Sequence, residues 1–119
     1  MEKRNEIVEI SLEFALGVIE YTELLEEQKK YVIARQLMKS GTSIGANIRE
    51  AQSCESKADF IHKLKISAKE AEETEYWLLL CQKSKSYPDP DHKLKSLLSS
   101  IQKLLSKIIF TTRSNMKRS

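Results

Sequence analysis

The stretch QLMKSGTSIGANIREAQ, residues 36–52, combines helically spaced apolar side chains with an unusual number of small and polar residues. At about 100° per residue, one stripe of such a helix carries Ile33, Leu37, Ile44 and Ile48. A second stripe directly beside it carries Ser40, Ser43, Asn47 and Glu50. Gly41 and Gly45 lie towards the other edge, where each costs about 1 kcal/mol relative to alanine in a solvent-facing helix. The stretch therefore predicts a helix that packs tightly on more than one side.

The length of 119 residues predicts one domain, spanning residues 1–119. Only three glycines and two prolines interrupt it, and charged residues make up 31%, which favours long helices over a sheet. No apolar run approaches the about 18 residues of a membrane span, and the charged start MEKRNEIVEI is unlike a secretory signal. We therefore expect a cytoplasmic protein that does not associate with membranes. Cys54 and Cys81 lack the spacing of metal ligands, which predicts reduced, structural thiols.

The first predicted helix, residues 5–25, has two adjacent apolar stripes. One stripe carries Ile7, Ile10, Phe14, Val18, Tyr21 and Leu25, and the other carries Val8, Leu12, Ala15 and Ile19. Together they cover more than the about 100° arc that one core-facing side requires. We therefore expect this helix to pack inward and also against another subunit. The alternative is a compact bundle that covers both stripes by itself.

Three further helices are predicted over residues 30–53, 57–86 and 90–111. Ser56 and Asp59 have the S-x-x-D spacing of a capping box before the third of the four helices. Pro88 ends that helix, and Asp89 is expected to cap the fourth, with Pro90 at its first position. The polar tail from about residue 112 is expected to fray. Four amphipathic helices joined by short turns predict an all-α, antiparallel up-down-up-down four-helix bundle.

Glu75 falls on the apolar stripe of the third predicted helix, between Ala71 and Leu78. An unpaired carboxylate there would be costly, so Glu75 needs a partner on the polar stripe of the second helix or among nearby lysines. The third helix also carries small residues, Ser67, Ala68 and Ala71, which we expect to approach residues 41–47. We favour a structural polar network over a catalytic or metal-binding carboxylate, because buried polar groups often set the register between helices.

Motifs for metal binding and catalysis are weak. Asp59 and His62 have the i, i+3 spacing used in di-metal bundle sites, but such a site needs the element twice. The only other match, Asp89 with His92, lies in the proline-containing turn. No nucleophile motif and no phosphate-binding glycine loop is present. We therefore expect no metal, no cofactor and no enzyme activity.

Basic residues are the stronger functional candidates, because no acidic residue follows Asp91. If several subunits placed their basic faces together, they would present a positive field to a phosphate backbone. The alternative is an ordinary solvated surface, offset by the glutamates of the first helix, and the sequence leaves both open. The candidates for nucleic-acid binding are Arg35, Lys39, Arg49, Lys63, Lys69, Lys93, Lys95, Lys103 and Lys107.

The opening stretch, followed by ADFIHKLKISAKEAEETEYWLLL at residues 58–80, resembles the four-helix-bundle family encoded in 23S rRNA intervening sequences, also labelled S23-like ribosomal proteins. The resemblance covers about residues 5–80, and beyond Pro88 only the helical character is shared. It implies an antiparallel bundle that assembles as a homopentamer. It also implies a likeness to the accessory variability protein of diversity-generating retroelements, a basic pentameric barrel that engages nucleic acid and a reverse transcriptase. The motif positions carried over, with an implied structural role, are Ser43, Asn47, Glu50, Glu72 and Glu75.

We therefore expect a non-enzymatic homo-oligomer, a pentamer, that binds RNA or DNA through basic outer surfaces. The alternative is a protein-binding scaffold that recruits a partner such as a reverse transcriptase and has no direct role in binding nucleic acid.

Overall fold

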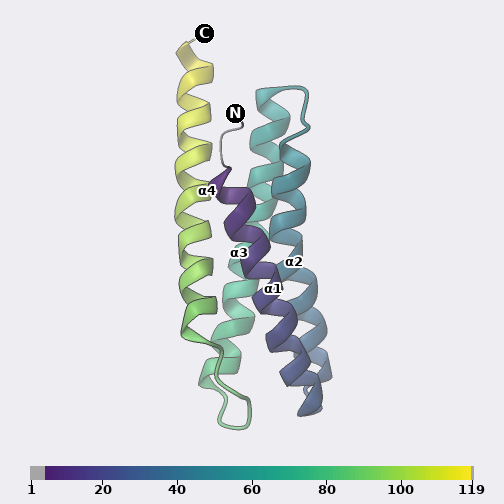
Figure 1. Ribbon diagram of the computed structural model, residues 1–119. Helices are drawn as coiled ribbons and strands as arrows, with labels where there is room; N and C mark the ends of the chain where they lie inside the picture. The colour runs from purple at the N-terminus through teal and green to yellow at the C-terminus, as the bar shows by residue number, and fades with distance from the viewer. Residues whose placement is uncertain (1–4, 119) are drawn as a thin grey trace.

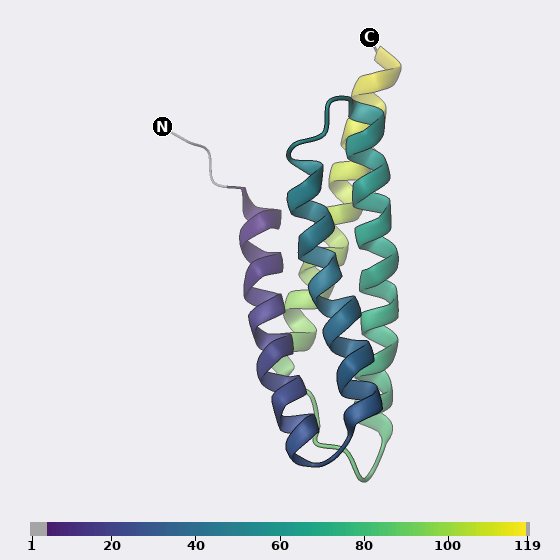
Figure 2. The same cartoon turned by 90° about the vertical axis from the view of Figure 1, so that its right-hand side faces the viewer.

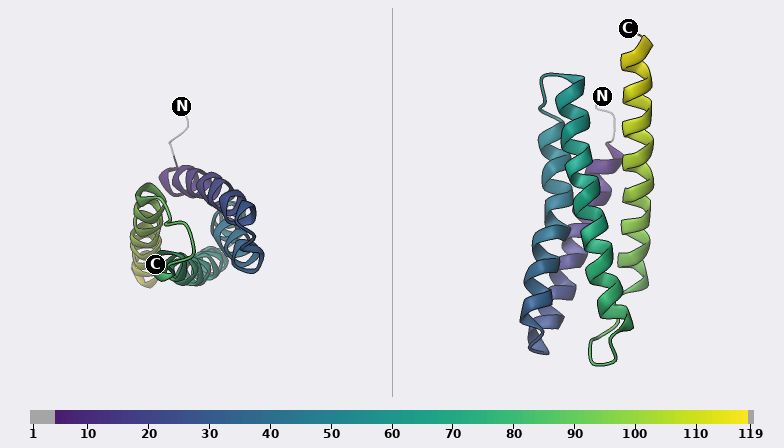
Figure 3. Two further views of the ribbon diagram at one scale, coloured as in Figure 1. Left: turned by 90° about the horizontal axis from the view of Figure 1, so that it is seen from below. Right: turned by 180° about the vertical axis from the view of Figure 1, so that it is seen from behind.

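The computed structural model of the chain describes residues 5–118, which form four helices and no strand. These are α1 (Glu6–Glu27), α2 (Tyr31–Ala51), α3 (Lys57–Lys83) and α4 (His92–Arg118). Successive helices run in opposite directions (Figure 1; Figure 2). Each helix packs against two neighbours, so that the four surround one core in the order α1, α2, α3, α4 (Figure 3). The predicted all-α four-helix bundle is confirmed.

The turn between α1 and α2 closes through backbone hydrogen bonds. The Lys30 N–H donates to the Leu25 carbonyl at 2.8 Å, and the Lys29 N–H donates to the Glu26 carbonyl at 2.9 Å. This is the Schellman arrangement, which places one residue in the left-handed region. Here that residue is Lys29, with φ 63°, where a glycine is more common.

The starts of α3 and α4 are capped by side chains. The Asp59 N–H donates to Ser56 Oγ at 3.1 Å, as the S-x-x-D spacing predicts. The helix ends at Lys83, earlier than predicted, because the backbone of Ser84 is extended. The prediction that α4 begins at Pro90 with Asp89 as its cap was also wrong. The helix begins at His92, and the Lys93 N–H donates to the Asp91 carboxylate at 2.8 Å.

The far end of α4 differs most from the prediction, because the helix continues to Arg118 instead of fraying from residue 112. No glycine or proline interrupts residues 92–118. Lys117 and Arg118 lie in the last turn, where cations interact favourably with the negative end of the helix dipole. The last turns of α4 extend past the N-terminal end of α1 (Figure 1; Figure 2).

The core of α3 follows alternating steps of three and four residues. Its buried side chains include Leu64, Ser67, Ala71, Thr74, Leu78 and Cys81. This is a seven-residue repeat, which gives 3.5 residues per turn and is typical of helices that supercoil around each other. The prediction that Glu75 lies in the core was wrong, because the repeat buries Thr74 and leaves Glu75 exposed.

Helix α2 is packed on two sides, as residues 36–52 predict. One side contacts α1 and the other contacts α3. A Cβ added to Gly41 would lie 2.9 Å from Val18 Cγ2, and one added to Gly45 would lie 3.3 Å from Ser11 Oγ. The glycines therefore bring α2 close to α1. The small residues of α3 instead meet the serine side of α2, where Ser67 Oγ donates to the Ile44 carbonyl at 2.8 Å.

Candidate functional site

Charge is separated between α1 and α4, which are neighbours in the bundle. Helix α1 contains seven glutamates and no lysine or arginine: Glu6, Glu9, Glu13, Glu20, Glu23, Glu26 and Glu27. Helix α4 contains seven basic residues and no aspartate or glutamate: Lys93, Lys95, Lys103, Lys107, Arg113, Lys117 and Arg118. One ion pair joins the two, between Lys93 Nζ and Glu13 Oε1 at 3.2 Å. The protein therefore has an acidic side and a basic side.

The nine basic candidates from the sequence do not form one surface. Arg35, Lys39 and Arg49 are exposed on α2, and Lys69 is exposed on α3. Two others have carboxylate partners: Lys63 Nζ lies 3.3 Å from Glu50 Oε2, and Lys93 pairs with Glu13. Lys95 is half-buried and lines a shallow depression beside Glu75 of α3.

Lys103 and Lys107 remain as an exposed pair on α4, and within residues 5–118 neither forms an ion pair. Helical spacing places Arg113 and Lys117 on the same outward side, although neither was among the sequence candidates. Phe110 lies between these two pairs, and 73% of its surface is exposed. Phe110 lies within the helix predicted over residues 90–111, but sequence reasoning considered only the buried stripe and the basic residues of that helix and so missed it. The available signal was that residue 110 falls opposite the apolar stripe of α4.

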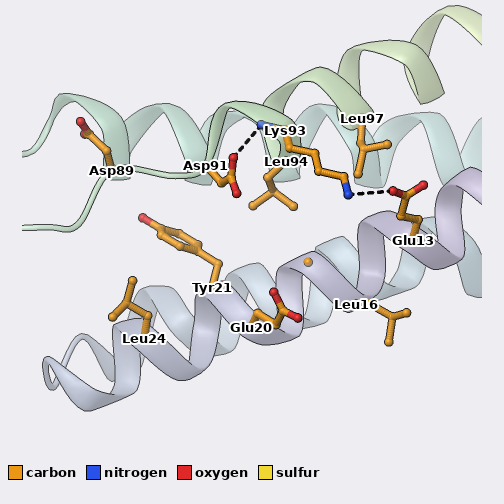
Figure 4. A pocket seen from close by; sticks show the side chains of 11 residues that line it. Glu13, Leu16, Glu20, Tyr21, Leu24, Asp89, Asp91, Lys93, Leu94 and Leu97 are labelled. Carbon is orange, nitrogen blue, oxygen red and sulfur yellow. Dashed lines mark hydrogen bonds and ion pairs between the residues drawn. The ribbon is translucent and has the colours of Figure 1, made fainter.

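A cavity of about 410 Å³ opens between α1 and α4 (Figure 4). Its apolar lining comes from Leu16, Gly17, Tyr21, Leu24, Leu94 and Leu97. Its polar lining comes from Glu13, Glu20, Asp89, Asp91 and Lys93. Figure 4 shows the Lys93 side chain reaching across one end to Glu13. Because carboxylates outnumber the single lysine, the charge of this cavity disfavours the binding of phosphate.

Tyr21, at the wall of this cavity, anchors the loop before α4. Its hydroxyl donates to the Pro88 carbonyl at 2.5 Å. Burial, and secondarily the Cys81 side chain, raise the pKa of Tyr21 well above its ordinary value. Burial also raises the pKa of the Cys81 thiol. Both groups are therefore protonated at neutral pH and act as structural contacts between α1, α3 and the loop.

The polar residues predicted as a seam are divided between two environments. Ser40 is fully buried and lies 2.9 Å from Thr74 across the α2–α3 interface. The hydroxyl of Ser43 and the side-chain amide of Asn47 donate within α2, to the carbonyls of Lys39 and Ser43 respectively. Glu50, Glu72 and Glu75 are exposed. The buried polar contact between α2 and α3 is therefore made by short hydroxyl side chains. Thr74, and not Glu75, contacts Ser40 there.

The described residues also bear on metal binding and on membrane insertion. Within residues 5–118, no three His, Cys, Asp or Glu side chains lie close enough together to hold a metal ion. Asp59 and His62, the i, i+3 pair, are both exposed. None of the described helices is both long and apolar enough to cross a membrane.

Comparison with solved structures gives a close match. A crystal structure from Bacteroides thetaiotaomicron VPI-5482, described as a protein with unknown function from the S23 ribosomal protein family, is 45% identical in sequence. The alignment covers 87% of this chain and 97% of that one, with a TM-score of 0.78. No curated protein matches the chain.

Comparison with family models identifies the same group. The model for the 23S rRNA-intervening sequence protein matches residues 3–108. This match is longer than the motif resemblance over residues 5–80, because it includes most of α4 and ends just before Phe110. The resemblance to this family is therefore confirmed, and the chain belongs to the 23S rRNA-intervening sequence protein family.

Proposed function

We propose that this protein is a non-enzymatic helical bundle that assembles as a homo-oligomer, a pentamer, and binds RNA or DNA through the basic outer side of α4. The observation that supports this most directly is the separation of charge between α1 and α4. A polyanion is attracted to a helix that carries seven cations and no carboxylate, and it is repelled by the glutamates of α1. This refines the expectation from sequence, which spread the interface over three helices.

Self-association is supported by the outer apolar stripe of α1. The side chains of Leu12 and Leu16 are 49% and 55% exposed, and Val8, Ala15 and Ile19 are half-buried beside them. Contiguous exposed apolar residues of this kind often mark interaction sites. Val8, Leu12 and Ala15 border a shallow groove on the α2 side of α1, away from α4. A contact there leaves the outer side of α4 open, and the family resemblance favours five copies.

Light scattering tests the assembly with a matched pair of variants. Leu12→Glu places a charge on the proposed contact and is expected to reduce the oligomer to smaller species. Leu79→Glu introduces the same charge at an exposed leucine on α3 and is expected to leave the size unchanged. A wild-type chain that is monomeric, or a loss of assembly in both variants, would contradict the proposed contact.

Fluorescence anisotropy with a labelled RNA, measured between about 50 and 200 mM salt, tests the nucleic-acid interface. The double substitution Lys103→Gln with Lys107→Gln is expected to weaken binding and to reduce the slope of log K against log salt by about 2. The control, Arg35→Gln with Lys39→Gln on α2, removes the same charge at two exposed positions with the same four-residue spacing and is expected to change neither. Equal effects in both variants would overturn the assignment to α4, and no binding at low salt would overturn the function.

A second candidate, a protein-binding scaffold, is supported by an aromatic patch on the outside of α3. The patch consists of Tyr76, Trp77, Leu79 and Leu80, with the two aromatic rings 5.6 Å apart. Tyrosine and tryptophan often dominate binding energy at protein interfaces. In this role the protein recruits an enzyme such as a reverse transcriptase and does not bind nucleic acid itself. A purified reverse transcriptase that binds the wild type but not Tyr76→Ala, together with no RNA binding at low salt, would favour this candidate.

A further inference from the structure

The most exposed large apolar side chain among the described residues is Phe110, on the outer side of α4. We define the Phe110 face by the residues three, four and seven positions away, which share its side of the helix: Lys103, Ser106, Lys107, Arg113, Ser114 and Lys117. Four of these six carry positive charge, and none is acidic. The ring therefore lies at the centre of a helix face on which every charged residue is a cation.

The fold does not require an aromatic residue at this position. The buried contacts of α4 come from Leu94, Leu98, Ile101 and Leu105, on the opposite side of the helix. Ile108 and Ile109 pack partly against the core, so Phe110 is the next residue that points outward. Single exposed apolar residues are common, but this one has cations on both sides along the helix axis.

The spacing around Phe110 is open enough for a planar ligand group. Ser106 and Ser114, one turn to either side, are small and do not cover the ring. Lys107 and Arg113 are each three positions away, and Lys103 and Lys117 lie about 10 Å along the axis on either side, given a rise of about 1.5 Å per residue. A ligand that fits must offer a flat apolar surface between negative charges.

An unpaired nucleic-acid strand has this combination. In a duplex the faces of the bases are stacked within the helix, whereas a single strand presents both bases and phosphates. We propose that the Phe110 face binds unpaired RNA or DNA, with one base stacked on the Phe110 ring and the adjoining phosphates held by Lys107 and Arg113. This deepens the proposed function and rests on it, because it states which form of nucleic acid the α4 surface selects.

An anionic membrane surface fits this face less well. Helices that lie in the membrane interface insert a broad apolar side, with several large residues. On α4 those residues are turned into the bundle, where Leu98, Ile101 and Leu105 are buried. Phe110 is left as a single outward anchor. Phe110, Arg113 and Lys117 of this face lie beyond residue 108, where the family match ends.

The test compares a labelled oligouridylate with a labelled duplex of equal length, using anisotropy at low salt and the full chain. Wild type is expected to prefer the single strand. Phe110→Ala is expected to bind the single strand roughly ten-fold more weakly and the duplex as before, because base stacking on one aromatic ring has about that effect. Its salt slope should match wild type, since no charge is removed. Phe110→Trp, in a Trp77→Phe background, should keep the affinity and lose fluorescence on binding.

The possible outcomes separate this inference from the function on which it rests. If Phe110→Ala binds both nucleic acids as wild type does, the inference is wrong while the proposed function stands. If wild type binds neither at low salt, both are wrong. If wild type binds phosphatidylserine vesicles and not RNA, and Phe110→Ala no longer binds the vesicles, the Phe110 face binds a membrane surface. A change of oligomer size in Phe110→Ala with unchanged RNA binding would assign it to a protein contact. Because the ring is exposed, the melting temperature of Phe110→Ala is expected to match wild type.

Discussion

The hydroxyl oxygens of Ser40 and Thr74 lie 2.9 Å apart across the interface of α2 and α3, and both side chains are fully buried. Thr74 Oγ1 also lies 2.7 Å from the Glu70 carbonyl within its own helix. Thr74 has one proton, so when it donates to Glu70, the bond across the interface is donated by Ser40. The two residues thus form one small polar unit in an otherwise apolar interface.

Removing one partner of this unit should cost more than removing both. Thr74→Val is expected to lower the free energy of unfolding by about 1–3 kcal/mol, because the Ser40 hydroxyl is left buried without its partner. Adding Ser40→Ala to Thr74→Val should recover part of that loss. Urea unfolding of the two single variants and the double variant measures the coupling. Strictly additive losses would show that the hydroxyls do not depend on each other.

Gly41 should tolerate alanine less well than Gly45. An alanine Cβ at position 41 meets the stiff, fully buried Val18 side chain at 2.9 Å, whereas at position 45 it meets Ser11 Oγ at 3.3 Å. Alanine gains about 1 kcal/mol in helix propensity at either position, but overpacking costs about 1–3 kcal/mol. We expect Gly41→Ala to be destabilising and Gly45→Ala to be close to neutral in thermal unfolding. Val18→Ala should remove the additional penalty at position 41, and equal effects at both glycines would contradict the packing argument.

Lys29 should be improved by glycine. Its φ of 63° lies in the left-handed region, which costs a residue with a Cβ atom about 1 kcal/mol. Lys29→Gly is therefore expected to raise the free energy of unfolding by about that amount, measured by urea denaturation. Lys29→Ala removes the same side-chain charge but keeps the Cβ atom, so it should not have this effect. A similar gain in both variants would point to the charge instead of the backbone.

Tyr21 makes stability depend on pH in the alkaline range. Burial raises its pKa above the ordinary value of 10.0, so the folded protein keeps the proton that the unfolded chain loses. Its contribution is fully present below pH 10.0 and is lost as pH rises further. At pH 7, Tyr21→Phe should be less stable by about 1 kcal/mol, because the hydrogen bond to Pro88 is lost. Urea unfolding from pH 7 to above pH 10 should show this difference shrinking, and a constant difference would exclude the role of Tyr21 ionisation.

Local signals in the sequence predicted the fold well. The Ser56 cap is one example, because both partners lie within four residues and their spacing identifies the bond. The packing of α2 on two sides could also be predicted, from its glycines and apolar stripe. Which neighbour each side meets could not, because this depends on how the helices surround the core. Gly41 faces Val18 of α1, although the small residues of α3 had suggested the other partner.

The candidate site was harder to predict, because, of two neighbouring positions on a helix, one can be buried and the other exposed. A repeat of 3.6 residues places Glu75 in the core, whereas the 3.5-residue repeat of packed helices buries Thr74. All nine basic candidates could be named from the sequence, but the sequence does not show that two of them form ion pairs with carboxylates on other helices. Those are Lys63, which pairs with Glu50, and Lys93, which pairs with Glu13.

The opposite charges of α1 and α4 make the net charge of +3 a poor description of how this protein meets other molecules. The chain resembles an electric dipole whose two poles are adjacent helices. A polyanion is repelled when it approaches the α1 side and attracted when it approaches the α4 side. The association rate therefore depends on the orientation of the protein. Added salt shortens the range of both effects to about 10 Å at 0.1 M. The same dipole should let the protein bind to both cation and anion exchangers at low ionic strength.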